Sequence, residues 1–161
     1  MRLLALDPSL TCTGWATFDA GKLDTFGSII TNKKADTEIR LQEITELLDD
    51  VMLGQGLTNA VIEIPAPGIY GRKRKGHDKY VTAVQVCKSV CWQRLGADKV
   101  FLVDAPTWKK TAKKQDTIMV VNAEHGLCLK KKDNDIADAI ALGDWYLRDL
   151  KFRKLKADAG L

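Results

Sequence analysis

Short apolar runs separated by polar turns predict a β-sheet in this chain. Residues 2–7 read RLLALD, an apolar run of strand length that ends in an acid. Two further strands are predicted over residues 13–19 and 22–31, with a turn at Ala20-Gly21 between them. We expect these three strands to form an antiparallel meander.

Helical spacing of apolar residues takes over in the middle of the chain. One helix is predicted between Asp36, which is expected to cap it, and Gly54. A second helix is predicted over 78–95, and its apolar surface is wider than one stripe, which suggests burial by another helix or by a partner subunit. Two more helical segments are expected at about 113–124 and 134–150.

Two short β-rich runs complete the pattern, at residues 59–64 and 99–104. The order βββ-α-β-α-β-α-α predicts an α/β fold with a five-stranded mixed sheet and helices on both faces. In this fold the antiparallel meander is joined by two parallel strands. The 161 residues show no repeat or linker, so we expect a single domain over 1–161.

Charge is distributed unevenly along a chain whose net charge is only +4. Basic clusters occur at Arg72–Lys75, at Lys109, Lys110, Lys113 and Lys114, and at Lys130–Lys132. They predict a basic face for a polyanion, although solvated basic loops are an equally good explanation from charge alone. Without a membrane-length apolar run or CxxC cysteine spacing, we expect a reduced cytoplasmic protein that binds no membrane.

Acids lie at the ends of two predicted buried strands, Asp7 after the first and Glu63 in the fourth. If these strands are adjacent and parallel, the two carboxylates meet at the same rim of the sheet and repel each other unless a cation is bound. Asp135 and Asp138 are three residues apart and share one face of the last helix. Taken alone, Asp135 is also an ordinary first-turn acid, which the helix dipole favours.

These four acids together predict a site for Mg²⁺ or Mn²⁺, because both ions prefer carboxylate oxygen and water as ligands. Two such ions are able to activate a water molecule and stabilise the leaving oxygen in phosphodiester hydrolysis. That chemistry requires a polyanionic substrate, which the basic clusters would attract. No small-molecule cofactor is expected.

Three stretches in this order, LLALDPSLTCTGWA, VIEIP and DIADAIAL, resemble the acidic motifs of RuvC-type Holliday-junction resolvases. These enzymes belong to the retroviral-integrase/RNase H-like superfamily, so the resemblance implies an RNase H-like fold. It also implies that Asp7, Glu63, Asp135 and Asp138 are the catalytic carboxylates, and that a homodimer cuts symmetric strands of a four-way DNA junction. The compact, divergent chain is similar to phage or viral members, which would place it in the host cytoplasm.

The stretch AKKQDTIMVV resembles the family segment that carries a catalytic lysine, with Lys113 as the nearest counterpart and Lys114 as the alternative. Ser9 replaces the glycine usual after the Asp-Pro pair. The aromatic residue expected near Glu63 is out of register, and Tyr70 is the local candidate. Trp108 is expected to anchor the core, with DNA contact as the alternative. The predicted DNA-binding residues are Tyr70, Arg72, Lys73, Arg74, Lys75, Lys109, Lys110 and Lys114.

The sequence therefore predicts a metal-dependent, structure-selective endodeoxyribonuclease that resolves Holliday junctions, with other branched DNA as an additional candidate substrate. Two alternatives stay open at this point: a catalytically silent junction-DNA-binding module, and an RNase H-like nuclease that acts on other nucleic acid. Retention of all four acids argues against a silent binder, because carboxylates near DNA weaken binding unless metal ions are present.

Overall fold

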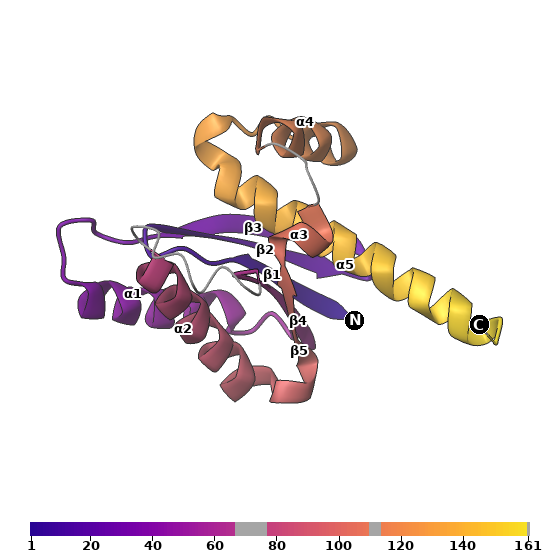
Figure 1. The fold of residues 1–161 in the computed structure, drawn as a ribbon, viewed down its shortest axis with the longest axis horizontal. Helices are drawn as coiled ribbons and strands as arrows, with labels where there is room; N and C mark the ends of the chain where they lie inside the picture. Colours follow the sequence, from indigo (N-terminus) through magenta and orange to yellow (C-terminus); the bar gives the residue numbers. More distant parts are fainter. Residues whose placement is uncertain (67–76, 110–113, 161) are drawn as a thin grey trace.

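The computed structural model describes residues 1–66, 77–109 and 114–160, which build a five-stranded sheet with helices on both faces (Figure 1). The elements are β1 (Arg2–Asp7), β2 (Cys12–Asp19), β3 (Lys22–Ile30), α1 (Thr37–Met52), β4 (Asn59–Ile64), α2 (His77–Leu95), η2 (Ala97–Lys99), β5 (Val100–Asp104), α3 (Ala105–Lys109), α4 (Lys114–His125), η3 (Lys131–Asp133) and α5 (Asn134–Asp158).

The strand order is β3-β2-β1-β4-β5. Strands β1, β2 and β3 pair antiparallel, whereas β4 pairs parallel with both β1 and β5. Each predicted strand is confirmed to within one residue at either end. The helix after β3 explains the parallel pairing, because a helical crossover returns the chain to the same end of the sheet.

Alternation along β1 divides the core into two layers. Leu4 and Leu6 belong to the apolar cluster that includes residues of α1 and α2. Leu3 and Ala5 belong to the other cluster, which includes residues of α5. Figure 1 shows α1 and α2 on one side of the sheet and α5 on the other, with α4 lying on α5. This arrangement confirms the prediction of helices on both faces.

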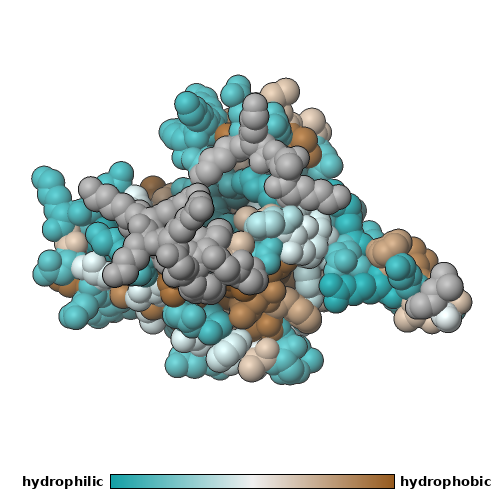
Figure 2. Space-filling model, in the orientation of Figure 1, coloured by the Kyte–Doolittle hydropathy of each residue, from teal (hydrophilic) through white to brown (hydrophobic). Residues whose placement is uncertain are grey.

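The last helix is longer than the sequence pattern predicts, because α5 continues from residue 150 to residue 158. Figure 1 shows this end projecting beyond the sheet, and the side chains of Phe152 and Leu155 there are 57% and 67% exposed. Figure 2 shows further apolar surface in its lower centre, over β5, where Phe101 and Leu102 are exposed. None of the helices within the described ranges is long and apolar enough to cross a membrane.

Two local features differ from the prediction. Asp36 is the N-cap residue of α1, as predicted, but its side chain makes no capping hydrogen bond within the described ranges. The short helix α3 was not predicted. Asp104 caps it, because its Oδ1 accepts the backbone N–H of Thr107 at 2.8 Å. The acid followed by Pro106 in the first turn was the available signal.

Candidate acidic active site

Asp7 and Glu63 lie side by side at the carboxyl ends of two parallel strands. Leu6 in β1 pairs with Ile62 in β4, so the residue that follows each of them is level with the other. Ala5 and Val61 both belong to the core cluster on the α5 side of the sheet. Because side chains alternate along a strand, Asp7 and Glu63 point to that same face.

The first turns of α5 bring the other two predicted acids to this face. A Cβ atom added to Gly14 would lie only 1.9 Å from the backbone oxygen of Asp135. Gly14 is also the residue that pairs with Asp7 across β1 and β2. The absence of a side chain at this position therefore lets the start of α5 rest directly on the sheet, beside Asp7.

Glu63 and Asp138 share an electrostatic environment. Burial is the main reason that the pKa of the Glu63 carboxyl is raised, and the negative charge of Asp138 raises it further. A hydrogen bond from Trp108 opposes this shift most strongly, and the charge of Lys109 also opposes it. Asp138 itself is only 4% exposed. Glu63 and Asp138 are thus two acidic side chains in a partly buried environment. A bound cation would stabilise their ionised forms.

Two donors fix the Glu63 carboxylate. The indole Nε1–H of Trp108 donates to Oε2 at 2.9 Å, and the hydroxyl of Tyr80 donates to Oε1 at 3.4 Å. Trp108 is 8% exposed and belongs to the α5-side core cluster, which confirms its expected place in the core. Neither donor was predicted to contact the acids, since Trp108 is 45 residues from Glu63 and no local pattern links them.

Lys109 lies beside one of the predicted acids. We predict it as part of a DNA-binding surface, but its Nζ donates to Asp138 Oδ1 at 2.5 Å. The side chains of Lys109 and Asp138 are 15% and 5% exposed. An ion pair this deeply buried requires good geometry to offset desolvation. The ammonium group of Lys109 thus belongs to the acidic cluster itself.

Cys12 marks the point where Asp7 and Asp135 approach each other. Burial, a hydrogen bond with Asp135 and the charges of both acids raise the pKa of the Cys12 thiol to about 11. The thiol therefore lies beside Asp135 at the start of α5 and is influenced by the charge of Asp7 at the end of β1. In the sequence, a cysteine next to an acidic motif gives no specific signal for this position.

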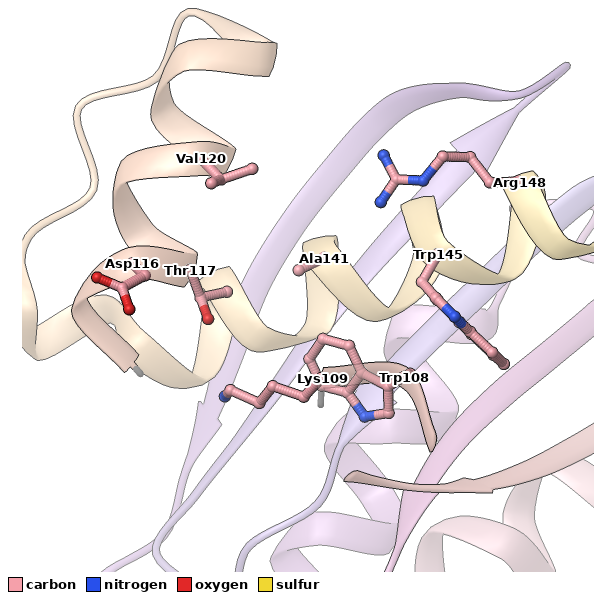
Figure 3. A pocket seen from close by; sticks show the side chains of 8 residues that line it. All are labelled: Trp108, Lys109, Asp116, Thr117, Val120, Ala141, Trp145 and Arg148. Carbon is pink, nitrogen blue, oxygen red and sulfur yellow. The ribbon is translucent and has the colours of Figure 1, made fainter. Parts of the chain in front are cut away.

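A cavity of about 170 Å³ lies next to α3 and is lined by residues of α3, α4 and α5 (Figure 3). Its lining includes Trp108, Lys109, Thr117, Ala141, Trp145 and Arg148. Figure 3 shows the indole nitrogen of Trp108 on the edge of the ring that faces away from Ala141 and Val120. Trp108 and Lys109, which contact Glu63 and Asp138, therefore also form part of this cavity.

A second group of possible metal ligands contains none of the four predicted acids. One ligand atom each from Glu124, His125 and Asp144 lies within 4.8 Å of the others. His125 Nε2 is 2.7 Å from Asp144 Oδ2, and Arg148 forms an ion pair with Glu124 at 3.7 Å. Since these pairs join α4 to α5, we interpret the group as a contact between the two helices.

Most of the residues predicted to bind DNA, and the predicted catalytic lysine, fall outside the described part of the chain. These are Tyr70, Arg72, Lys73, Arg74, Lys75, Lys110 and Lys113. Lys114 begins α4, but its side chain is not among those described. The predicted DNA-binding surface and the predicted catalytic lysine at position 113 therefore remain predictions.

The chemistry of the donors at the rim fits a hard divalent cation. All four predicted ligands are carboxylates, which Mg²⁺ and Mn²⁺ prefer. The raised pKa of Glu63 has the direction expected when the ionised form is poorly compensated, and a divalent ion would compensate it. The ammonium group of Lys109 supplies one positive charge beside Asp138, which is the kind of neighbour that these acids require.

No family model matches the chain. Over 59 residues it is 42% identical to the crossover junction endodeoxyribonuclease RuvC of Ehrlichia chaffeensis, and the matched stretch covers 34% of this chain and 38% of that protein. Among solved structures, Thermus thermophilus RuvC bound to a Holliday junction substrate superposes with a TM-score of 0.71, 18% identity and coverage of 90% and 92% of the two chains. The yeast mitochondrial Holliday junction resolvase superposes with a TM-score of 0.60, 10% identity and coverage of 99% and 86%. The chain thus has the RuvC type of RNase H-like fold over nearly its whole length.

Proposed function

We propose that this protein is a metal-dependent, structure-selective endodeoxyribonuclease that resolves Holliday junctions by paired phosphodiester hydrolysis. One observation carries the proposal: Asp7 and Glu63 are level at the carboxyl ends of two parallel strands, on the face where α5 presents Asp138. The local similarity to RuvC and the shared fold support the choice of substrate.

Asp7, Glu63, Asp135 and Asp138 would hold two Mg²⁺ or Mn²⁺ ions. When bound, such ions supply activation of a water molecule and charge neutralisation at the leaving oxygen. The sheet and α5 would position the four carboxylates that hold these ions. Asp7 sits at the end of β1, and the glycine at position 14 lets the first turn of α5 approach it. Hydrolysis by this arrangement would leave a 5′-phosphate and a 3′-hydroxyl.

Lys109 would contribute to the reaction as well as to folding. Its ammonium group forms an ion pair with Asp138 and places a positive charge beside the acids, where the negative charge of a bound phosphodiester would develop. Lys113 would add a second cation, with Lys114 at the start of α4 as the alternative. The proposed mechanism thus combines four acids with at least one lysine from α3 or α4.

Branched DNA and a second copy of the chain are the proposed partners. Paired cuts on a four-way junction require two active sites, which a homodimer provides. Most apolar residues of α2, such as Cys87 and Cys91, are buried within the protomer, whereas Trp92 is 41% exposed. The basic segment Arg72–Lys75 with Tyr70, and the lysines at 110 and 114, would contact phosphates and bases of the junction.

The test compares wild type and Asp7→Asn on synthetic four-way, Y-shaped and linear DNA, with and without Mg²⁺ or Mn²⁺. We expect wild type to cut the four-way junction only with metal, and Asp7→Asn to be slower by more than about 1,000-fold while it still binds the junction. Asp24→Asn, an exposed acid on β3, is the matched control and should behave as wild type.

Each result bears on a different part of the proposal. Normal cutting by Asp7→Asn, or equal cutting without metal, would contradict the proposed active site. Equal cutting of linear and four-way DNA would contradict the junction selectivity and favour a general RNase H-like nuclease. Binding without cutting by the wild type under every condition would favour the silent junction binder.

A further inference from the structure

We infer that Trp108 is a positioning residue for metal binding: its indole N–H holds the Glu63 carboxylate in the orientation that a divalent cation requires. This inference rests on the proposed function, because it concerns the same acidic site. Trp108 is a core aromatic residue, and the role that we infer for it depends on its indole N–H alone.

The geometry at Glu63 carries the inference. Trp108 Nε1 is 2.9 Å from Oε2, and the Tyr80 hydroxyl is 3.4 Å from Oε1, so each carboxylate oxygen has a donor on a different element. Rotation of the carboxylate about its last bond would break both contacts. Each oxygen keeps lone pairs that the protein donors do not use, and these are the ones available to a cation.

The position of Trp108 explains why this hydrogen bond is unusually well fixed. The side chain is 8% exposed and packs in the α5-side core, so the ring has little freedom to move. A buried indole N–H requires an acceptor, and a backbone carbonyl is the common one. Here the acceptor is an acid at the rim of the sheet, which makes the apolar core a rigid support for a polar site.

The neighbouring residue strengthens this argument. Lys109 follows Trp108 directly and is hydrogen-bonded to Asp138 on α5, and its Nζ lies 5.3 Å from the centre of the Trp108 ring. The short helix α3 thus holds two carboxylates that come from separate elements, β4 and α5. Residues that orient metal-binding carboxylates commonly affect metal affinity by about 10- to 100-fold when they are changed.

Metal binding without DNA gives the first test. Calorimetric titration with Mn²⁺ would compare Trp108→Phe, which keeps a ring but loses the N–H, with wild type. We expect Mn²⁺ affinity to fall by about 10-fold. Trp92→Phe is the matched control, because Trp92 is exposed on α2, and its Mn²⁺ affinity should equal that of wild type. Equal affinity in both variants would overturn the inference.

A measurement on the unaltered chain avoids any effect of substitution on folding. The four tryptophans give four indole N–H signals in a ¹⁵N-labelled sample, which can be assigned through the chain. Addition of Mg²⁺ should shift the Trp108 signal and leave the Trp92 signal in place. If Mg²⁺ changed neither signal while calorimetry detected binding to the same sample, the hydrogen bond would not respond to the metal and the inference would be wrong.

Cleavage kinetics then separate this inference from the proposed function. Trp108→Phe should need about 10-fold more metal for half-maximal rate but recover most of the wild-type rate at saturation. Trp108→His, which keeps a ring N–H, should restore part of the metal affinity. If Asp7→Asn is inactive and Trp108→Phe shows a normal metal requirement, only the role of Trp108 fails. If Asp7→Asn cuts normally, the proposed active site fails whatever Trp108 does.

Discussion

The two faces of the sheet both bury charged side chains, and they do so in different ways. On the face covered by α1 and α2, Arg40 is 7% exposed and donates three hydrogen bonds, to Thr31 Oγ1, Leu10 O and Thr11 Oγ1, at 2.9, 2.9 and 3.0 Å. On the face covered by α5, two acids from separate elements, Glu63 of β4 and Asp138 of α5, lie near the buried ammonium group of Lys109.

The difference lies in how completely each charge is compensated. The acceptors of Arg40 are neutral oxygens of two adjacent chain segments, so its guanidinium ties the loop after β1 to the end of β3. The acids on the α5 face repel each other, and the raised pKa of Glu63 records this repulsion together with its burial. We therefore expect charge on the first face to serve stability, and charge on the second to serve binding of a cation.

The largest expected effect comes from moving the acidic face itself. In Gly14→Ala the new Cβ would lie 1.9 Å from the Asp135 backbone oxygen, so α5 must shift away from the sheet. A displacement of about 1 Å in catalytic groups is able to lower the rate by about 100-fold, and we expect at least that loss in the cleavage assay. Overpacking should also lower stability by about 1–3 kcal/mol.

Gly143→Ala is the control for this substitution. Its added Cβ would lie 2.1 Å from the Phe18 ring, so it also disturbs the packing of α5 on the sheet, but more than one turn away from Asp138. We expect a similar loss of stability and a smaller loss of activity. Equal losses of activity in both variants would show that the position of the first turn of α5 has no special importance.

An intermediate effect is expected from Arg40→Met. The substitution removes three hydrogen bonds donated by the guanidinium, and Leu10 O keeps only its bond from the Thr31 hydroxyl, which should lower the free energy of unfolding by about 2–4 kcal/mol. Urea denaturation would measure this change. Cleavage per folded molecule should stay at the wild-type level, and a fall in that value would remove the distinction between the two faces.

The smallest expected effect is a gain in stability from Glu63→Gln without metal. The folded-state pKa of Glu63 is raised above its ordinary value of 4.5, so ionisation costs folding free energy that is absent below pH 4.5 and appears as the pH rises. Glutamine does not ionise. The melting temperature of Glu63→Gln should therefore match wild type in acid and exceed it slightly at neutral pH.

We expect a divalent metal ion to reverse the difference in melting temperature between wild type and Glu63→Gln. Addition of Mg²⁺ at neutral pH should raise the melting temperature of wild type more than that of Glu63→Gln, because the cation binds the folded form of the wild type more tightly. A wild type that is more stable than Glu63→Gln at neutral pH without metal would contradict our account of the uncompensated charge.

The strands and most helices were predictable because their signals are local. Period-2 alternation and turn residues located β1 to β5, and acids at strand ends indicated which side chains would meet once β1 and β4 were taken as parallel. Helix α3 has only five residues, which is too short for a periodic pattern. The C-terminal end of α5 was placed too early because its last turns bury little apolar surface.

Contacts between distant segments were not predictable from one sequence. The pairs Trp108–Glu63 and Lys109–Asp138 join residues 45 and 29 positions apart. Only the folded chain brings them together, and an aromatic residue before a lysine has many ordinary explanations. Gly14 did carry a signal, since a glycine inside a strand often marks a close backbone approach, but the sequence does not say which segment approaches.

The short helix α3 has a consequence for how the acidic site could be altered by mutation. Because α3 clips one carboxylate of the sheet and one of the long helix, a sideways slip of this single turn would alter both at once. The five residues of α3 thus help to set the spacing between Glu63 and Asp138, together with the larger elements that carry these acids. Substitutions in α3 would therefore be a simple way, in evolution or in protein engineering, to change which ions the proposed site binds.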